Sequence, residues 1–207
     1  MLEDSMKERI IQIAKSEFLA NGYLGASTRN IAQKAGLTTG ALYNRFIGKD
    51  ELFEEVVGSS AKKLLDEFSF SHEEFMNFDL DIQIESMFTY SHEKVQRMLD
   101  IVYSDIDAFN IILTKSSGSR YEFYIDNMVE MEVESTFKFI NVLKQKGKEI
   151  VEIDETLMHM ICTAMFNLFF EPVKHGMDKD KASKYVENGF KFFDAGWSVL
   201  FDSLDKK

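Results

Sequence analysis

The stretch TRNIAQKAGLTTGALYNRF, residues 28–46, predicts two short helices joined by a tight turn. Its first half has an apolar face at helical spacing that ends at Ala35, and Gly36 then interrupts the pattern. Thr38 is a preferred N-cap residue for a second helix, which we expect to end near Phe46. Two short helices with small residues at their turn have the outline of a helix-turn-helix.

The second helix of this pair has the composition of a surface that reads the major groove of DNA. Leu42 and Phe46 can anchor it to the rest of the module, which leaves the small and polar positions on the outer face. Gly40 would let the backbone approach DNA closely, at a cost in helix propensity of about 1 kcal/mol relative to alanine. The residues available to this outer face are Thr38, Thr39, Gly40, Tyr43 and Asn44.

Charge is distributed unevenly along the 207 residues, whose formal net charge is −11. Residues 1–50 hold seven Lys/Arg and five Asp/Glu, a net charge of +2, so residues 51–207 carry −13. Between Phe18 and Lys49 there are four basic residues and no acid. An acidic body repels a polyanion, whereas this segment does not. The asymmetry favours a nucleic-acid-binding module attached to an acidic domain.

Helical periodicity and helix-breaking residues predict an all-α chain of about nine helices. The segment 69–80 loses this periodicity and is interpreted as a linker, and Pro172 is expected to end the helix before it. The Asn21-Gly22 pair is expected to end the first helix. The expected helices span about 5–21, 28–35, 38–46, 50–68, 81–102, 105–115, 119–146, 154–171 and 179–204.

Several classes of protein do not fit this sequence. Cys162 is the lone cysteine, which excludes an intramolecular disulfide framework, and no apolar run approaches the 18 or so residues of a membrane span. The acids near the start do not suit a secretory signal, so we expect a soluble cytoplasmic protein without membrane contact. There is no nucleophile–base pair or phosphate loop to indicate an enzyme, and the histidines lack the neighbours of a metal site. No cofactor or metal is expected.

Residues 28–46, followed by Lys49-Asp50-Glu51-Leu52, resemble the DNA-binding domain of TetR-type transcriptional regulators. That family's pattern runs T-x-x-x-I-A-x-x-A-G-[VL]-[ST]-x-G-x-[LI]-Y-x-[HY]-F and then K-[ED]-x-L, and nearly every fixed position matches. Arg45 departs from it, because the family often has histidine there, although both side chains can meet a phosphate. The resemblance covers about residues 5–55.

This resemblance implies a helix-turn-helix DNA-binding domain over residues 1–48 and a helical effector-binding and dimerisation domain over 49–207. It implies a homodimeric repressor that binds a palindromic double-stranded operator and is released by a small, mainly hydrophobic or aromatic effector. Thr28 would cap the second helix, for which the residues alone offer either Ser27 or Thr28. The Tyr43 hydroxyl would donate to a phosphate, and Lys49 would add charge at a phosphate. The implied DNA-binding set is Thr28, Arg29, Thr38, Thr39, Gly40, Tyr43, Asn44, Arg45 and Lys49. Packing for Tyr43 and a solvated surface for Arg29 and Lys34 are the alternatives.

The region after residue 80 is rich in methionine and phenylalanine, which can repack around varied apolar shapes. A hydrophobic ligand pocket and an ordinary core both fit this composition. The candidate ligand-binding residues are Met87, Phe109, Tyr124, Met128, Met131, Cys162 and Phe166. The last two helices carry continuous apolar stripes, which suit either a dimer interface or a single intramolecular core. The candidate interface residues are Phe169, Val186, Gly189, Phe190, Phe193 and Trp197.

Four carboxylates recur every four residues in the segment 119–146, at Glu122, Asp126, Glu130 and Glu134. A solvated outer face is one interpretation of this stripe. The other is that one carboxylate faces the pocket, where beside aromatic rings it would favour a cationic ligand. Two other functions also stay open: a DNA-bound architectural factor that senses no small molecule, and a helical-bundle enzyme acting on a lipid or aromatic substrate.

Overall fold

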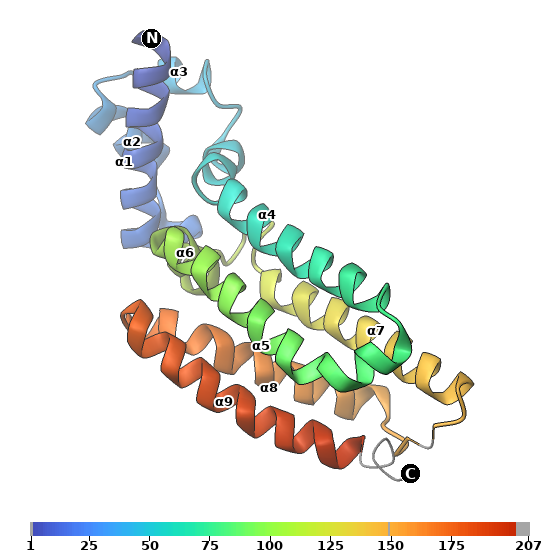
Figure 1. Ribbon diagram of the computed structural model, residues 1–207. Coiled ribbons are helices and arrows are strands. Elements are labelled where there is room, and N and C mark those ends of the chain that lie inside the picture. Colours follow the sequence, from blue (N-terminus) through green and yellow to red (C-terminus); the bar gives the residue numbers. More distant parts are fainter. Residues whose placement is uncertain (1, 149, 202–207) are drawn as a thin grey trace. The chain divides into compact units, whose positions relative to one another are not determined.

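The computed structural model describes residues 2–148 and 150–201, and every regular element in these ranges is a helix (Figure 1). The predicted all-α class is therefore confirmed. Within the described ranges there are nine helices: α1 (Leu2–Gly25), α2 (Thr28–Ala35), α3 (Thr39–Tyr43), α4 (Lys49–Met76), α5 (Leu80–Ser104), α6 (Ile106–Lys115), α7 (Tyr124–Gln145), α8 (Glu155–Lys174) and α9 (Lys179–Leu200).

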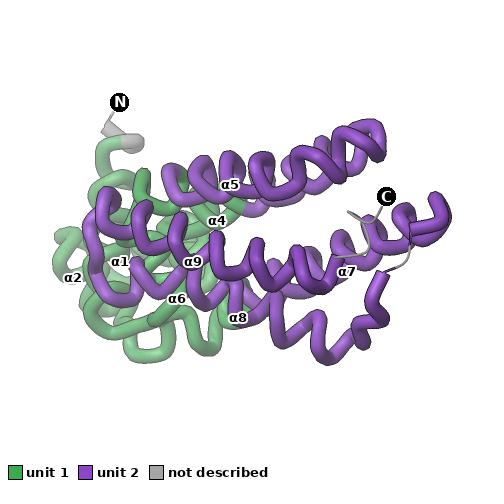
Figure 2. Tube along the Cα trace, turned by 60° about the horizontal axis from the view of Figure 1, so that its bottom comes forward, with its two compact units in different colours: residues 1–64, 101–124 green, residues 65–100, 125–207 purple. Residues whose placement is uncertain are grey.

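The chain divides into two compact units, which Figure 2 shows in different colours. Unit 1 comprises residues 1–64 and 101–124, and unit 2 comprises residues 65–100 and 125–207. The structural division therefore differs from the predicted boundary at residue 48, because the start of α4 and the whole of α6 belong with the N-terminal helices. The assignment of DNA binding to residues 1–48 and effector binding to 49–207 stays a prediction.

Unit 1 has an aromatic core that fixes its N-terminal helices. Phe18 of α1 meets Phe53 of α4 edge-on, with ring centroids 4.8 Å apart, and Tyr23 meets the same ring at 5.1 Å. Such edge-to-face pairs contribute roughly 0.5–1.5 kcal/mol beyond the burial of their area. The buried side chains around them come from α1, α2, α3 and α6, including Ile10, Ala14, Ile31, Leu42, Phe109 and Ile111.

Unit 2 is built on the last three helices and on the parts of α4 and α5 that belong to it. Helices α8 and α9 pack on each other, and they lie side by side in Figure 1. Phe166 of α8 meets Phe68 edge-on at 5.5 Å, and Phe139 of α7 meets Phe201 at 6.3 Å. Aromatic rings thus line much of the interior of this unit.

The predicted linker at 69–80 is wrong, because α4 continues to Met76 and only residues 77–79 separate it from α5. The apolar periodicity fades there because polar residues occupy the segment. In the structure, two of these side chains contact carbonyl groups of the helix itself. Ser71 Oγ donates to the carbonyl of Glu67 at 2.7 Å, and His72 Nδ1 lies 2.9 Å from the carbonyl of Phe68. Tertiary packing of one face sustains the helix where its sequence pattern does not.

Three other predicted boundaries also change. Gly22 has a φ of 67° and interrupts α1 as expected, although helical residues resume and run to Gly25. Pro172 does not end α8, which continues to Lys174. Helix α7 starts at Tyr124 rather than at 119, because turns occupy the preceding residues. The predicted end of the last helix at 202–204 lies outside the described residues.

Candidate functional site

Helices α2 and α3 form the predicted helix-turn-helix, and the caps of α2 define the start of the motif. Ser27 is the N-cap of α2, and its hydroxyl accepts from the backbone N–H of Asn30 at 3.2 Å. Thr28 is therefore not the cap, as the resemblance implied, but the first residue of the helix. At the other end Gly36 has a φ of 75° in the left-handed region, and its N–H donates to the carbonyl of Gln33 at 3.0 Å.

Helix α3 is held by its inner side chains and leaves its outer face open. The hydroxyl of Thr38 accepts from the N–H of Ala41 at 3.1 Å, which starts the helix as predicted. Leu42 and Phe46 are 1% and 2% exposed and fix the helix to unit 1. The predicted groove-facing residues Thr38, Gly40, Tyr43 and Asn44 are exposed, and Thr39 is half-buried.

Tyr43 and Thr28 are joined by a hydrogen bond between their side chains. The phenolic oxygen of Tyr43 lies 3.0 Å from Oγ1 of Thr28, so the end of α3 is tied to the start of α2. Tyr43 is 47% exposed, which is incompatible with the alternative that it fills the core. The pair therefore presents two hydroxyl groups together at the surface of the module.

The basic side chains of the module differ in their surroundings. Arg29 and Arg45 are exposed, and Arg45 Nη1 donates to the carbonyl of Ala41 at 3.4 Å. Lys49 is engaged inside unit 1: its Nζ donates to the carbonyls of Leu24 and Ala26 at 3.2 and 3.3 Å. This ammonium also lies 4.9 Å from the centroid of the Tyr23 ring. Lys49 thus fastens α4 to the end of α1, which the sequence did not predict.

Glu17 is a buried carboxylate that joins α1 to α2. Its side chain is 3% exposed and accepts from Asn21 Nδ2 at 3.0 Å, from the N–H of Ser27 at 3.4 Å and from Lys34 Nζ at 3.0 Å. Burial alone raises a carboxyl pKa, but these donors and the charge of Lys34 outweigh it, so the pKa of Glu17 is lowered. The spacing of Glu17 and Asn21, four residues apart on one helix face, is the only sequence signal for this contact.

Unit 2 contains a partly open cavity of about 190 Å³ between its helices. Eleven of its 23 lining residues are Phe, Tyr or Trp, so its wall is mainly aromatic. The lining aromatic residues are Phe68, Phe75, Phe88, Tyr90, Phe139, Phe166, Phe169, Phe190, Phe193, Trp197 and Phe201. The remaining apolar ones are Met87, Val95, Met98 and Met165, and the polar ones are Ser71, His72, Ser91, Lys94, Glu132, Ser135, Thr136 and Asp194.

Two carboxylates at the cavity wall are each paired with a histidine. His72 Nε2 lies 3.0 Å from Oε2 of Glu132, and His92 Nε2 lies 2.6 Å from Oδ2 of Asp194. Burial lowers the pKa of His72, but the hydrogen bond and charge of Glu132 outweigh that effect, and the pKa is raised overall. These pairs bring α4 to α7 and α5 to α9 within unit 2.

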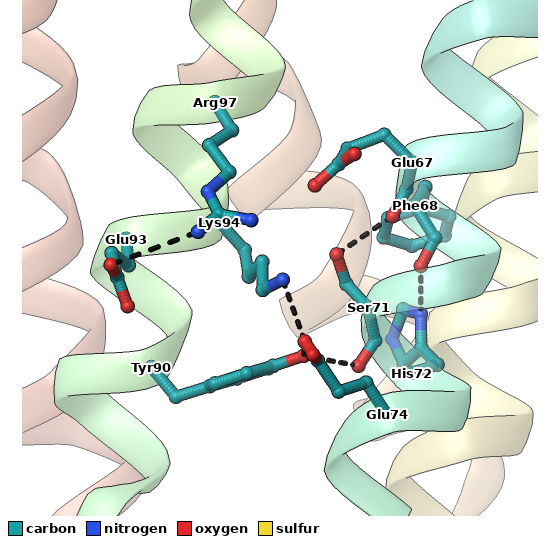
Figure 3. Close-up of polar contacts among 9 residues, drawn as sticks. All are labelled: Glu67, Phe68, Ser71, His72, Glu74, Tyr90, Glu93, Lys94 and Arg97. Atoms are coloured by element: carbon teal, nitrogen blue, oxygen red, sulfur yellow. Dashed lines mark hydrogen bonds and ion pairs between the residues drawn. The ribbon is translucent and has the colours of Figure 1, made fainter.

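The lysine at the cavity wall is already neutralised (Figure 3). Lys94 is 4% exposed, and its Nζ donates to Oε2 of Glu74 at 2.7 Å. The same carboxylate oxygen accepts from the Tyr90 hydroxyl at 2.7 Å, and that hydroxyl also lies 2.8 Å from the carbonyl of Ser71. Burial, followed by the bond to Glu74, raises the pKa of Tyr90. Glu67 reaches towards this cluster in Figure 3, and its Oε1 is buried without a hydrogen-bond partner among the described residues.

Comparison with known proteins links the helix-turn-helix to a family. Residues 10–56 match the family model described as bacterial regulatory proteins, tetR family. This match assigns the N-terminal segment, residues 10–56, to the DNA-binding domain type of that family. The match covers α2 and α3 entirely, together with most of α1 and the start of α4.

Curated HTH-type transcriptional regulators extend this similarity beyond residues 10–56. The HTH-type transcriptional regulator SrpR of Pseudomonas putida is 26% identical over 134 residues, which are 63% of this chain and 62% of that protein. The HTH-type transcriptional regulator TtgW, also of Pseudomonas putida, is 35% identical over 98 residues, 47% of this chain and 63% of that protein. The chain thus spans somewhat less than two thirds of the length of either relative.

Solved TetR structures share the whole fold. A TerR/AcrR-family transcriptional regulator from Aquifex aeolicus VF5 superposes with a TM-score of 0.61 at 19% identity, covering 91% of this chain and 99% of that one. NalD, the secondary repressor of the MexAB-OprM multidrug efflux pump in Pseudomonas aeruginosa, gives a TM-score of 0.56 at 17% identity, covering 91% and 94%. At these identities the similarity concerns the fold alone.

The cavity contains few of the residues that were predicted to bind a ligand. Met87 and Phe166 line it, whereas the other five predicted residues do not. Phe109 is buried in unit 1, and the Tyr124 hydroxyl donates to the carbonyl of Ala61 at 2.8 Å in that same unit. Met128 and Cys162 are fully buried, and Met131 is half-buried elsewhere in unit 2. Composition indicated an aromatic, Met-rich interior but not which helix face turns inward.

The residues predicted for the dimer interface are arranged differently from that expectation. Four of them, Phe169, Phe190, Phe193 and Trp197, line the cavity, and Val186 is fully buried within the single chain. Gly189 lies against Leu168, whose Cδ1 would be only 2.4 Å from a Cβ placed there, so this glycine allows α8 and α9 to approach. The role of these six residues in dimerisation stays a prediction.

The remaining sequence hypotheses concern the acidic stripe, metals and membranes. Glu122, Asp126, Glu130 and Glu134 are all exposed, so the solvated interpretation holds and the carboxylate from α7 that faces the cavity is Glu132. Among the described residues no group of three or more His, Cys, Asp or Glu side chains is placed to hold a metal ion. In that same part of the chain, no helix combines the length and apolarity of a membrane span.

Proposed function

We propose that this chain is a DNA-binding transcriptional repressor that acts as a homodimer on a palindromic operator. The observation that carries the proposal is the exposed outer face of α3, with Thr38, Gly40, Tyr43 and Asn44 held out by the buried Leu42 and Phe46. This face lies in the acid-free segment of an acidic chain. Groove-facing side chains then read bases, while hydroxyl and basic groups beside them position the module on phosphates.

Homodimer formation is supported by apolar side chains that one copy leaves exposed on its last two helices. Leu157 and Met160 of α8 are 42% and 63% exposed, and Phe192 and Val199 of α9 are 76% and 70% exposed. Large apolar side chains exposed on two packed helices support an interaction surface on α8 and α9. In a two-fold dimer the two α3 helices would reach successive major grooves about 34–36 Å apart.

An effector is supported by the cavity of unit 2, which is concave, mainly aromatic and provided with a few polar groups, as small-molecule sites are. The names of relatives point the same way: NalD is described as a repressor of a multidrug efflux pump. The proposed effector is a small, mainly hydrophobic or aromatic molecule that binds in this cavity and thereby weakens DNA binding. The curated relatives are named as transcriptional regulators rather than enzymes.

Footprinting of the DNA upstream of the chain's own gene and of neighbouring genes tests the proposal. A protected palindrome whose half-sites lie about one helical turn apart is expected. Protection without symmetry, or no protection at low salt, would refute the dimeric repressor. A small molecule that releases the footprint separates this function from that of an architectural factor, whose footprint would persist.

A further inference from the structure

We propose that the cavity of unit 2 binds a small aromatic monocation, whose charge is balanced by Glu132 and Asp194. This inference rests on the proposed function, because it specifies the chemical class of the effector at that site. Both carboxylates line the cavity, from α7 and from α9 respectively. The charges, the aromatic rings and the size of the cavity each support a small aromatic monocation.

The fixed charges at the wall favour a cation. Lys94 is the lining residue with a permanent positive charge, and Glu74 already neutralises it at 2.7 Å. Among the described residues, Glu132 and Asp194 form ion pairs only with histidines, His72 and His92 respectively. Neither carboxylate is thus paired with a lysine or arginine in the described part of the chain, and a bound cation can supply a permanent positive charge beside them. Glu67, with its unpartnered buried oxygen, adds further negative charge near the Lys94 cluster (Figure 3).

An anionic ligand fits this arrangement poorly. To reach Lys94 it would have to displace Glu74, and it would lie in a cavity lined by two other carboxylates. The Lys94 ammonium is also held over the rings of Tyr90 and Phe70, with Nζ 5.0 and 5.5 Å from their centroids. Displacement would remove the partner of Glu74 and bring another anion beside Glu132 and Asp194, where like charges repel.

The rings of the wall give a cation a second source of attraction. The negative faces of Phe, Tyr and Trp attract quaternary ammonium groups, and cages of such rings are a common way to recognise them. Trp197 follows Asp194 by three residues on α9, so the indole and the carboxylate are neighbours on one helix face. Both line the cavity.

The volume limits the ligand to a small molecule. An engineered cavity of about 150 Å³ holds benzene, and typical ligand pockets have about 300–1,000 Å³. The present cavity of about 190 Å³ therefore suits a single ring with a short charged arm. Benzyltrimethylammonium has this shape, neopentylbenzene is its neutral isostere, and phenylmethanesulfonate places an anion in a similar position.

Isothermal titration of the full chain with these three probes tests the inference. The cation is expected to bind at least ten-fold more tightly than the neutral isostere, and the anion most weakly. Glu132→Gln and Asp194→Asn should each reduce the preference for the cation at least three-fold while leaving the affinity for neopentylbenzene unchanged. Glu130→Gln is the matched control, because Glu130 is exposed on the same helix α7. Retained neopentylbenzene binding shows that each variant is folded.

Equal affinity for the cation and its neutral isostere would overturn the inference, as would a preference for the anion or the absence of binding by all three probes. A preference unaffected by both substitutions would overturn the role of the two carboxylates. DNA binding by each sample, followed by fluorescence anisotropy, is an independent readout of the proposed function. Release of DNA by the neutral probe alone would support effector binding and reject only the cationic class.

Discussion

The hydroxyl of Tyr43 lies 3.0 Å from that of Thr28, so the end of α3 and the start of α2 share one hydrogen bond at the surface. If the Tyr43 hydroxyl donates to a DNA phosphate, Thr28 orients it for that contact. We expect Tyr43→Phe to weaken binding to all DNA sequences roughly ten-fold, because a hydrogen bond to a charged group contributes about 1.5–3 kcal/mol. Anisotropy titrations against operator and unrelated DNA measure the effect. Undiminished affinity at physiological salt would show that Tyr43 does not face the backbone.

Asn44 is exposed on the same face of α3 and is expected to act differently. A side chain that reads a base contributes about 1–3 kcal/mol of discrimination at one position, whereas a phosphate contact contributes none. Asn44→Ala should therefore leave non-specific binding unchanged and relax the preference at one base pair in each half-site. Binding selections from a randomised operator library would reveal this change. A uniform loss across all sequences would instead place Asn44 on the backbone.

Glu17 is expected to control the stability of the module. Glu17→Ala removes the acceptor for Asn21, Ser27 and Lys34, and should lower the free energy of unfolding by about 1–3 kcal/mol in urea melts. The pKa of Glu17 is lowered in the folded protein, so its contribution is present above about pH 4.5 and lost as the pH falls through the folded value. Glu8→Ala, on the exposed part of the same helix, is the control. Equal effects of the two substitutions would contradict this account.

His72 should make unit 2 more stable in mild acid. Its pKa is raised in the folded state because Glu132 outweighs burial, so the pair's contribution is fully present below the unfolded value of about 6.5. That contribution is lost as the pH rises through the higher folded value. Urea melts from pH 5.5 to 8.5 should therefore show a difference between the wild type and His72→Asn that is largest at the acidic end. His159→Asn, at an exposed position on α8, is the control substitution.

The exposed apolar residues of α8 and α9 are expected to hold the dimer together. Phe192→Glu would place a charge in a buried interface, where an unpaired ion is costly, and should shift sedimentation towards the monomer. Phe123 is 62% exposed in unit 1, so Phe123→Glu serves as a matched control and should leave the assembly intact. A dimer that persists in Phe192→Glu at micromolar concentration would show that the interface lies on another surface.

The helix-turn-helix could be predicted from sequence because its determinants are local. Gly36 adopts the left-handed conformation that ends α2, and Thr38 caps α3 with its own side chain. Both effects act within four residues, so no knowledge of the tertiary structure is required. The roles of Glu17 and Lys49 could not be predicted, because their partners are brought together only by the packing of α1 against its neighbours.

Most of the residues that line the cavity could not be predicted from the sequence. Phe190 and Phe193 follow the spacing of an apolar stripe, which indicates burial without saying against which surface. The stripe suits either a dimer interface or an intramolecular core, and within the single chain both residues line the cavity. Likewise, periodicity located α7 but could not distinguish the inward Glu132 from the outward Glu130 and Glu134. Only the rotation of the helix about its axis, set by packing, decides between them.

The burial of Glu17 bears on how fast the protein finds its operator. Because the last acid before the acid-free segment is hidden and paired with Lys34, the charges that segment exposes are positive. An encounter with DNA is then favoured through this segment, while the net negative charge of the remainder of the chain opposes other orientations. A larger share of collisions with DNA should therefore lead to binding, and the association rate should fall as salt is added. Complexes formed through the rest of the surface should be short-lived.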